Sequence, residues 1–183
     1  MKELSLNILD VAKNSVSAGA QLIKIELFTD DNGWLTLTIE DDGCGMSEET
    51  VENVTNPFYT TRKTRRVGLG LPFLKLAAEQ TGGELKLASS VDKENHGTTL
   101  KATFDTKSID FMPLGDIVST ICILIAGSPE IDFLFSDKSE NVEVILDTRE
   151  IKAILGGGIS LAEPEIQQWI SEYLKEQYQG IVK

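Results

Sequence analysis

The chain has 183 residues, a formal net charge of −12 at pH 7 and 41% apolar residues. This length is sufficient for a sizeable hydrophobic core in one domain, or in one domain with a small addition. The acidity argues against binding to nucleic acid or to an anionic membrane surface, because phosphate groups attract lysine and arginine. The single histidine, His96, excludes mechanisms that need two histidines.

Three further absences bear on where the protein works. The longest apolar run, residues 117–126, is interrupted by Ser119 and Thr120, whereas a membrane-spanning helix needs about 18 apolar residues. The N-terminus lacks the basic, apolar and small-residue zones of a signal peptide. Cys44 and Cys122 are too few for a disulfide framework. We therefore expect a cytoplasmic, reduced protein without a membrane partner.

Hydrophobic periodicity in residues 1–106 predicts the order α-β-β-α-loop-α-β-β. Apolar side chains at helical spacing predict helices, and alternating apolar side chains predict strands. The predicted helices cover residues 3–18, 47–54 and 69–80, and the predicted strands cover residues 22–28, 34–39, 84–89 and 98–104. This order predicts an α+β fold, a two-layer α/β sandwich with helices on one face of a mixed sheet, which closes near Thr106.

Residues 107–183 are expected to form a small C-terminal α/β appendage to a first domain over residues 1–106. The predicted elements are a helix, two strands and two helices, over residues 113–126, 131–135, 142–146, 149–155 and 163–178. The segment Met112-Pro113-Leu114 resembles a helix start with proline near the first turn. No motif in this half carries recognisable chemistry, so we expect it to dock a protein partner or a second copy of the chain.

Asp10 and Asn14 form the first of four segments with a functional pattern. They are four residues apart on the first predicted helix, so they share one face of it. An amide oxygen can bind a hard cation, and a carboxylate can orient a water molecule or accept a proton. Two polar residues on a solvated helix face are the alternative interpretation of this pair.

Glycines mark the other three segments. Residues 41–45, Asp-Asp-Gly-Cys-Gly, follow a strand, where glycine lets a ligand approach the backbone and Asp41 can accept a hydrogen bond from an exocyclic amine. Gly68 and Gly70 precede a helix, whose first N–H groups favour phosphate. Residues 97–99, Gly-Thr-Thr, begin a strand. Taken alone, residues 41–45 could be a tight turn, Gly68 and Gly70 could simply precede a helix, as glycine often does, and residues 97–99 could be an ordinary turn.

Together, in this order, the four segments resemble the Bergerat-fold ATP-binding domain of the GHKL superfamily, which includes DNA gyrase, heat-shock chaperone ATPases, histidine kinases and MutL. Asp10 and Asn14 match its N box, and residues 41–45, 68–71 and 97–99 match its three glycine boxes. Residues 14–20 also look like the N box of MutL. The resemblance covers about residues 1–106 and implies ATP and Mg²⁺ as ligands.

The resemblance implies roles for the matching residues. Asn14 would bind Mg²⁺, and Asp10 would be the catalytic base or proton acceptor. The family usually has glutamate at the position of Asp10; the shorter side chain is farther from the γ-phosphate, and a displacement of about 1 Å can cost about 100-fold in rate. Asp41 would bind the adenine amino group, Thr99 would share a water molecule there, and Gly43 and Gly45 would pass beside the base.

The remaining implied roles concern the phosphates. Residues 56–67 would form an ATP lid whose cations can reach the γ-phosphate, although each could also be a solvated surface residue; they are Arg62, Lys63, Arg65 and Arg66. The second glycine box would present backbone N–H groups to the phosphates; it consists of Gly68, Leu69, Gly70 and Leu71. Cys44 is either a small buried filler or a redox-sensitive thiol, and His96 is expected on the surface.

Within the superfamily, the chain looks most like stand-alone switch kinases of the anti-sigma type. It begins at the N box, without the helix pair that carries the phosphorylated histidine of sensor kinases, and residues 107–183 are short and acidic for a transducer domain. We therefore expect a Mg-ATP-binding regulatory protein, either a slow ATPase or a Ser/Thr protein kinase. The alternative is a non-catalytic nucleotide-sensing module whose ATP lid gates a protein partner. If residues 107–183 dock a partner, their deletion should retain ATP binding and abolish partner binding.

Overall fold

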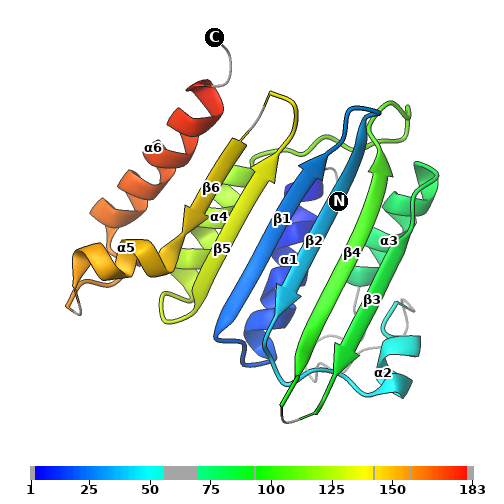
Figure 1. Ribbon diagram of the computed structural model, residues 1–183, viewed down its shortest axis with the longest axis horizontal. Helices are drawn as coiled ribbons and strands as arrows, with labels where there is room; N and C mark the ends of the chain where they lie inside the picture. Colours follow the sequence, from blue (N-terminus) through cyan, green and yellow to red (C-terminus); the bar gives the residue numbers. More distant parts are fainter. Residues whose placement is uncertain (1–2, 56–69, 93, 142, 157, 181–183) are drawn as a thin grey trace.

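The structure is a computed structural model that describes residues 3–55, 70–92, 94–141, 143–156 and 158–180 (Figure 1). The predicted order of helices and strands is confirmed in both halves of the chain. The elements are α1 (Leu4–Ser17), β1 (Leu22–Thr29), β2 (Trp34–Asp41), α2 (Glu48–Asn53), α3 (Gly70–Gln80), β3 (Leu85–Ser90), β4 (Gly97–Asp105), α4 (Ile117–Gly127), β5 (Asp132–Lys138), β6 (Glu143–Asp147), α5 (Thr148–Leu155) and α6 (Pro164–Gly180).

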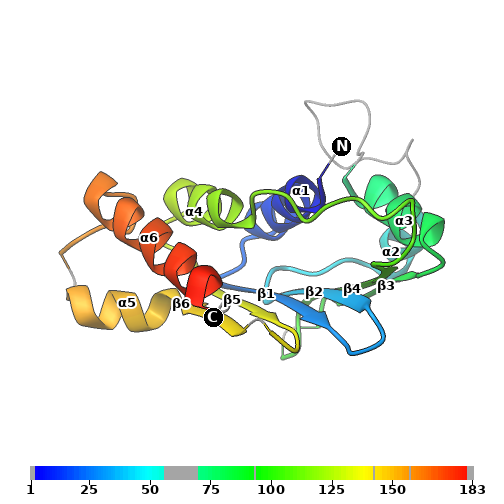
Figure 2. The same ribbon diagram turned by 90° about the horizontal axis from the view of Figure 1, so that it is seen from above.

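One mixed sheet organises the molecule, with the strand order β3-β4-β2-β1-β5-β6. The pair β1 and β5 is parallel, and the other neighbouring strands are antiparallel. Helices α1, α3 and α4 lie side by side over one face of the sheet (Figure 2). The predicted α+β two-layer sandwich is therefore confirmed. Within the part of the chain that the structure describes, no helix has the length and apolar character needed to cross a bilayer.

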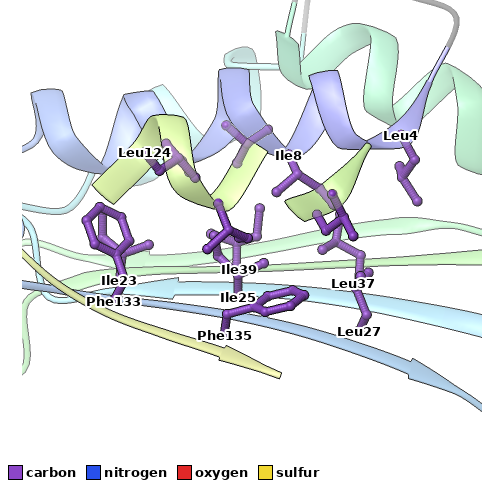
Figure 3. Close-up of a cluster of buried hydrophobic side chains, with 14 of the residues drawn as sticks. Leu4, Ile8, Ile23, Ile25, Leu27, Leu37, Ile39, Leu124, Phe133 and Phe135 are labelled. Atoms are coloured by element: carbon purple, nitrogen blue, oxygen red, sulfur yellow. The ribbon is translucent and has the colours of Figure 1, made fainter. Parts of the chain in front are cut away.

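The core lies between the sheet and these helices and extends across both halves of the chain. Strand alternation points Ile23 and Ile25 of β1 toward the helices, and both are at most 1% exposed. In the parallel register they are paired with Phe133 and Phe135 of β5. Figure 3 shows these side chains beneath α1 and beside Leu124 of α4. Burial of this continuous apolar surface is the main force that holds the two halves together.

The sheet does not close near Thr106, contrary to the expectation from sequence. Residues 107–183 have the α/β elements predicted for them, but β5 and β6 extend the same sheet beyond β1. A parallel partner for β1 requires a long connection, because the chain must return to the same end of the sheet. In this chain the partner strand β5 lies about 110 residues after β1 in sequence. Local periodicity could not identify a partner at that distance.

Helix α4 begins at Ile117, four residues after the predicted start. Asp116 caps it by accepting hydrogen bonds from the hydroxyl and the backbone N–H of Ser119, at 2.6 and 2.9 Å, and these bonds lower the pKa of Asp116. Pro113 has another function: its carbonyl accepts from the N–H of Leu4 at 2.9 Å. The segment before α4 therefore satisfies a free donor at the start of α1.

The last helix, α6, is attached to the sheet by two polar side chains. The hydroxyl of Tyr178 donates to a carboxylate oxygen of Asp137 on β5, at 2.7 Å. The amide of Gln177 accepts from the N–H of Ile145, at 2.9 Å, and donates to its carbonyl, at 3.1 Å. Because Ile145 lies on the edge strand β6, Gln177 satisfies backbone groups that would otherwise be open to pairing with another strand.

Asp137 should give the stability a distinctive pH dependence. Asp137 is 8% exposed; burial raises its pKa, and the hydrogen bond from Tyr178 lowers it by less. The folded state therefore binds this proton more tightly than the unfolded state does. The contribution of Asp137 to stability is largest below the ordinary aspartate pKa of about 3.9 and is lost as the pH rises through the raised value.

Asp137→Asn keeps an acceptor for Tyr178 but cannot ionise. We expect the free energy of unfolding of this variant to exceed that of the wild type by more at about pH 7 than at about pH 4. Urea denaturation at the two pH values measures this difference. Asp110→Asn, at an exposed aspartate, is the matched control and should show a smaller change. An equal effect of Asp137→Asn at both pH values would contradict the assignment.

Candidate nucleotide-binding site

Helix α1 brings the N box and the second glycine box together. Asp10 and Asn14 are both half-buried on this helix. The side chain of Asp10 lies against the start of α3, so that a Cβ added to Gly70 would be 3.3 Å from the Cβ of Asp10 and 3.5 Å from its Oδ2. The carboxylate is thus beside the first turn of α3, whose N–H groups and helix dipole favour an anion.

Asp41, at the end of β2, is held from two sides. Its Oδ2 accepts a hydrogen bond of 2.5 Å from the hydroxyl of Ser15 on α1, and its Oδ1 accepts one of 2.9 Å from the N–H of Gly43. Each carboxylate oxygen has a further lone pair with which it can accept from an amine. Ser15, which is 4% exposed, was not predicted as a site residue; a serine within the apolar stripe of the first helix is the sequence signal that could have identified it.

The glycines of the first box are required by packing against the protein itself. A Cβ on Gly43 would be 2.8 Å from the Cβ of Ala18, and one on Gly45, where φ is +70°, would overlap with the carbonyl of Ser90. The loop can therefore press against α1 and β3. Cys44 is exposed, so its interpretation as a buried filler is wrong.

The hairpin of β3 and β4 completes the site from the other side. The Ser89 hydroxyl accepts from the N–H of Met46 at 2.8 Å and donates to the Gly97 carbonyl at 2.9 Å. The exposed ring of His96 has its Nδ1 2.7 Å from the carbonyl of Gly43. A Cβ on Gly97, where φ is +134°, would overlap with the Asp41 carbonyl. Sequence predicted the exposure of His96 but not this contact, which joins the first and third glycine boxes.

The register of β4 contradicts the predicted position of Thr99. Thr98 is paired with Asp41, whereas Thr99 is paired with Glu40. Asp41 reaches Ser15 on the helix side of the sheet, so Thr98 lies on that side. Thr99 and Glu40 are exposed on the opposite face, away from the site. Thr98 therefore replaces Thr99 as the candidate that shares a water molecule with the base; its hydroxyl lies 2.8 Å from that of Ser89.

Several predicted site residues lie outside the described part of the chain, together with the predicted lid over residues 56–67. They are Arg62, Lys63, Arg65, Arg66, Gly68 and Leu69. Leu71 is described, and its side chain is only 8% exposed within the core. Only its backbone can therefore face a phosphate.

The donor set fits a magnesium ion that is held mainly by phosphate and water. Among the described residues, no group of three or more His, Cys, Asp and Glu side chains could hold a metal ion. Mg²⁺ commonly keeps several waters and binds through one or two protein oxygens together with substrate phosphates. The half-buried amide of Asn14, one turn from Asp10 on α1, is consistent with that mode.

Comparison with known proteins indicates the family of this chain. The family profile described as histidine kinase-, DNA gyrase B- and HSP90-like ATPase matches residues 1–108. The sensor histidine kinase CpxA of Escherichia coli K12 is 31% identical over 86 residues, which cover 44% of this chain and 19% of CpxA. Sporulation kinase E of Bacillus subtilis is 29% identical over 107 residues, which cover 58% of this chain and 14% of that kinase. The chain therefore matches less than a fifth of the length of either relative.

Solved structures support the fold over a longer part of the chain. The ATPase domain of MutL from Aquifex aeolicus, complexed with ADP, aligns with a TM-score of 0.52 over 85% of this chain and 69% of that chain, at 14% identity. The N-terminal domain of a DNA repair protein aligns with a TM-score of 0.56 over 86% of this chain and 58% of that chain, at 15% identity. The profile match, which covers more than half of the residues, establishes that this chain belongs to the family of histidine kinase-, DNA gyrase B- and HSP90-like ATPases.

Proposed function

We propose that this chain is a Mg-ATP-binding regulatory protein that transfers the γ-phosphate of ATP slowly, to water or to a serine or threonine of a partner protein. The observation that carries the proposal is the arrangement around α1. One helix positions Asp10 against the start of α3 and, five residues later, positions Ser15 on the carboxylate of Asp41. A phosphate-binding helix terminus and a base-binding carboxylate therefore flank the same helix.

Each described residue then has a chemical role. Asp41 accepts a hydrogen bond from the adenine amino group, while Ser15 and Gly43 hold its carboxylate in place. Asn14 would supply an amide oxygen to Mg²⁺, which when bound would offset the charge of the phosphates. Asp10 accepts the proton of the attacking water or hydroxyl. The proposal implies a cytoplasmic protein, where ATP and Mg²⁺ are available.

A nucleotide-sensing module without turnover is the second candidate, and the identity of Asp10 favours it. Aspartate is one methylene shorter than the glutamate usual in the family, so its carboxylate reaches less far from α1. A general base contributes typically about 10²- to 10⁴-fold to a rate only when it is in hydrogen-bonding reach of the proton. Nucleotide binding by the other residues does not require that reach.

Asn14→Ala is expected to remove the effect of Mg²⁺ on ATP binding. Loss of a single metal ligand should weaken binding by about tenfold or more with Mg²⁺ present and leave it nearly unchanged with EDTA. Isothermal titration calorimetry under both conditions measures this. Lys13→Ala, at the exposed neighbouring position, is the control and should keep the Mg²⁺ dependence. Unchanged Mg-ATP affinity in Asn14→Ala would show that Asn14 is not a metal ligand.

The experiment that tests the function follows the γ-phosphate of labelled ATP. The purified chain is mixed with Mg²⁺ and a lysate of its native host, and Asn14→Ala is the inactive control. Label on one discrete protein would establish a kinase and identify its partner, and label in free phosphate would establish an ATPase. Saturable ATP retention without transfer would favour the sensing module. Absence of ATP retention would overturn the proposal.

A further inference from the structure

The outer side of α6 has an unusual combination of aromatic and acidic side chains. Ile170 and Leu174 are fully buried and define the inner side of the helix. The residues at spacings i, i+4, i+7, i+8 and i+11 from Glu165 share another side, because these spacings return to nearly the same direction in a helix. They are Glu165, Trp169, Glu172, Tyr173 and Glu176, and all five are exposed.

The two aromatic side chains of this face form one preorganised surface. The rings of Trp169 and Tyr173 stack with centroids 5.2 Å apart and an interplanar angle of 14°. Trp169 is 47% exposed and Tyr173 is 38% exposed. Large aromatic side chains lose little conformational freedom on binding and are enriched at the energetic centres of protein interfaces. A stacked, exposed pair is thus suited to receive a flat or cationic group.

The charges around the pair select a basic partner. The face carries three glutamates, and the one basic residue in the sequence of α6, Lys175, lies three residues after Glu172. Lys175 is exposed, and its charge also acts on α4, where it opposes the rise in the pKa of Cys122 that burial causes. Three carboxylates therefore outnumber one ammonium group on the exposed side of α6. The chain as a whole has a net charge of −12, which adds long-range attraction for a cation.

The position of α6 leaves this face open. The helix lies at the end of the molecule beyond the edge strand β6, and Figures 1 and 2 agree that α4 and the sheet are on its inner side. Within the residues that the structure describes, the main contacts of α6 with other elements are to α4 and β6. The amide of Gln177 is hydrogen-bonded to the N–H and the carbonyl of Ile145 on β6, so this part of the strand edge is not available for pairing with a partner. A partner at this end of the molecule would instead contact the side chains of α6.

We infer that the Glu165–Glu176 face of α6 is a docking surface for a basic segment of a partner protein, whose arginine side chains stack on Trp169 and Tyr173 and pair with the flanking glutamates. Arginine suits this surface because its planar guanidinium both stacks on aromatic rings and forms bidentate bonds with carboxylates. The inference goes beyond the proposed function and does not depend on nucleotide binding, so the two can fail separately.

The test uses the full chain and a labelled peptide of alternating arginine and glycine, with a glutamate-glycine peptide as the probe of opposite charge. Fluorescence anisotropy measures binding at low salt and at about 0.2 M salt. We expect the arginine peptide to bind in a salt-dependent manner and the glutamate peptide not to bind. Trp169→Ala, which leaves the net charge unchanged, should weaken binding by about tenfold or more.

Two further variants separate this face from general attraction to an acidic protein. The double change Glu172→Gln and Glu176→Gln should also weaken binding by about tenfold, since it removes two charges beside the rings. Trp34→Ala, at a 36% exposed tryptophan on β2, is the matched control and should change the dissociation constant less than about twofold. Thermal melts confirm that each variant is folded.

Equal binding of the arginine peptide by the wild type and Trp169→Ala would overturn the inference, because it would indicate non-specific attraction only. Absence of arginine-peptide binding to the wild type at about 1 mM would overturn it as well. Sedimentation velocity tests whether a second copy of the chain binds to this face. A wild-type dimer that becomes a monomer in Trp169→Ala would show that the face binds a second copy instead of a basic segment.

Discussion

Asp41→Asn is expected to weaken ATP binding by about 10- to 100-fold, the range that corresponds to one hydrogen bond to a charged group. The wild-type carboxylate is held by Ser15 and Gly43 with acceptor capacity remaining for the adenine amine. Guanine has a carbonyl where adenine has its amine, and a carboxylate repels that oxygen. An asparagine amide can turn its N–H₂ toward it, so the preference for ATP over GTP should also fall.

Competition binding with ATP and GTP measures both effects of Asp41→Asn. Asp42→Asn is the matched control on the neighbouring residue. Its carboxylate accepts hydrogen bonds from the N–H groups of Gln21 and Leu22, so it holds the start of β1 and has a structural function. The control should keep the ATP preference even if its stability falls. An Asp41→Asn protein with the wild-type ratio of ATP to GTP affinity would show that Asp41 is only a turn residue.

Phe135→Ala is expected to lower the free energy of unfolding by about 3–5 kcal/mol, the usual cost of removing a phenyl ring from a close-packed core. Phe135 is 1% exposed and is paired with Ile25 of β1, beneath the helices of the first half of the chain (Figure 3). Phe28→Ala is the control, because Phe28 lies on the open face of β1 and is 43% exposed. Urea denaturation should show a much smaller loss for Phe28→Ala.

The same core changes the expected outcome of deleting residues 107–183. The sequence alone predicts that the remaining fragment keeps ATP binding, but the deletion would expose Ile23 and Ile25 and remove α4 from α1. We now expect a fragment of residues 1–106 to unfold and to lose ATP binding with it. A fragment that binds ATP as tightly as the full chain would contradict this, as would a Phe135→Ala protein no less stable than Phe28→Ala.

Sequence by itself determined the features that depend on neighbouring residues. The helices and strands follow from local periodicity, and the order of the N box and the glycine boxes indicated the ATPase family. The spacing of Asp10 and Asn14 placed both on one side of α1, since four residues span about one turn. These signals lie within single elements or short loops, so no knowledge of the tertiary structure was needed.

Tertiary structure alone decided which distant residues meet and which side of the sheet each one faces. The pairing of β1 with β5 joined the two halves into one core, and the register of β4 exchanged Thr99 for Thr98. A shift of one residue moves a strand side chain to the opposite face, and two consecutive threonines give no local indication of the register. The hydrogen bond from Ser15 to Asp41 and the contact of His96 with Gly43 likewise depend on packing between separate elements. Sequence therefore indicated the family, and the pairing of the strands decided which residues meet.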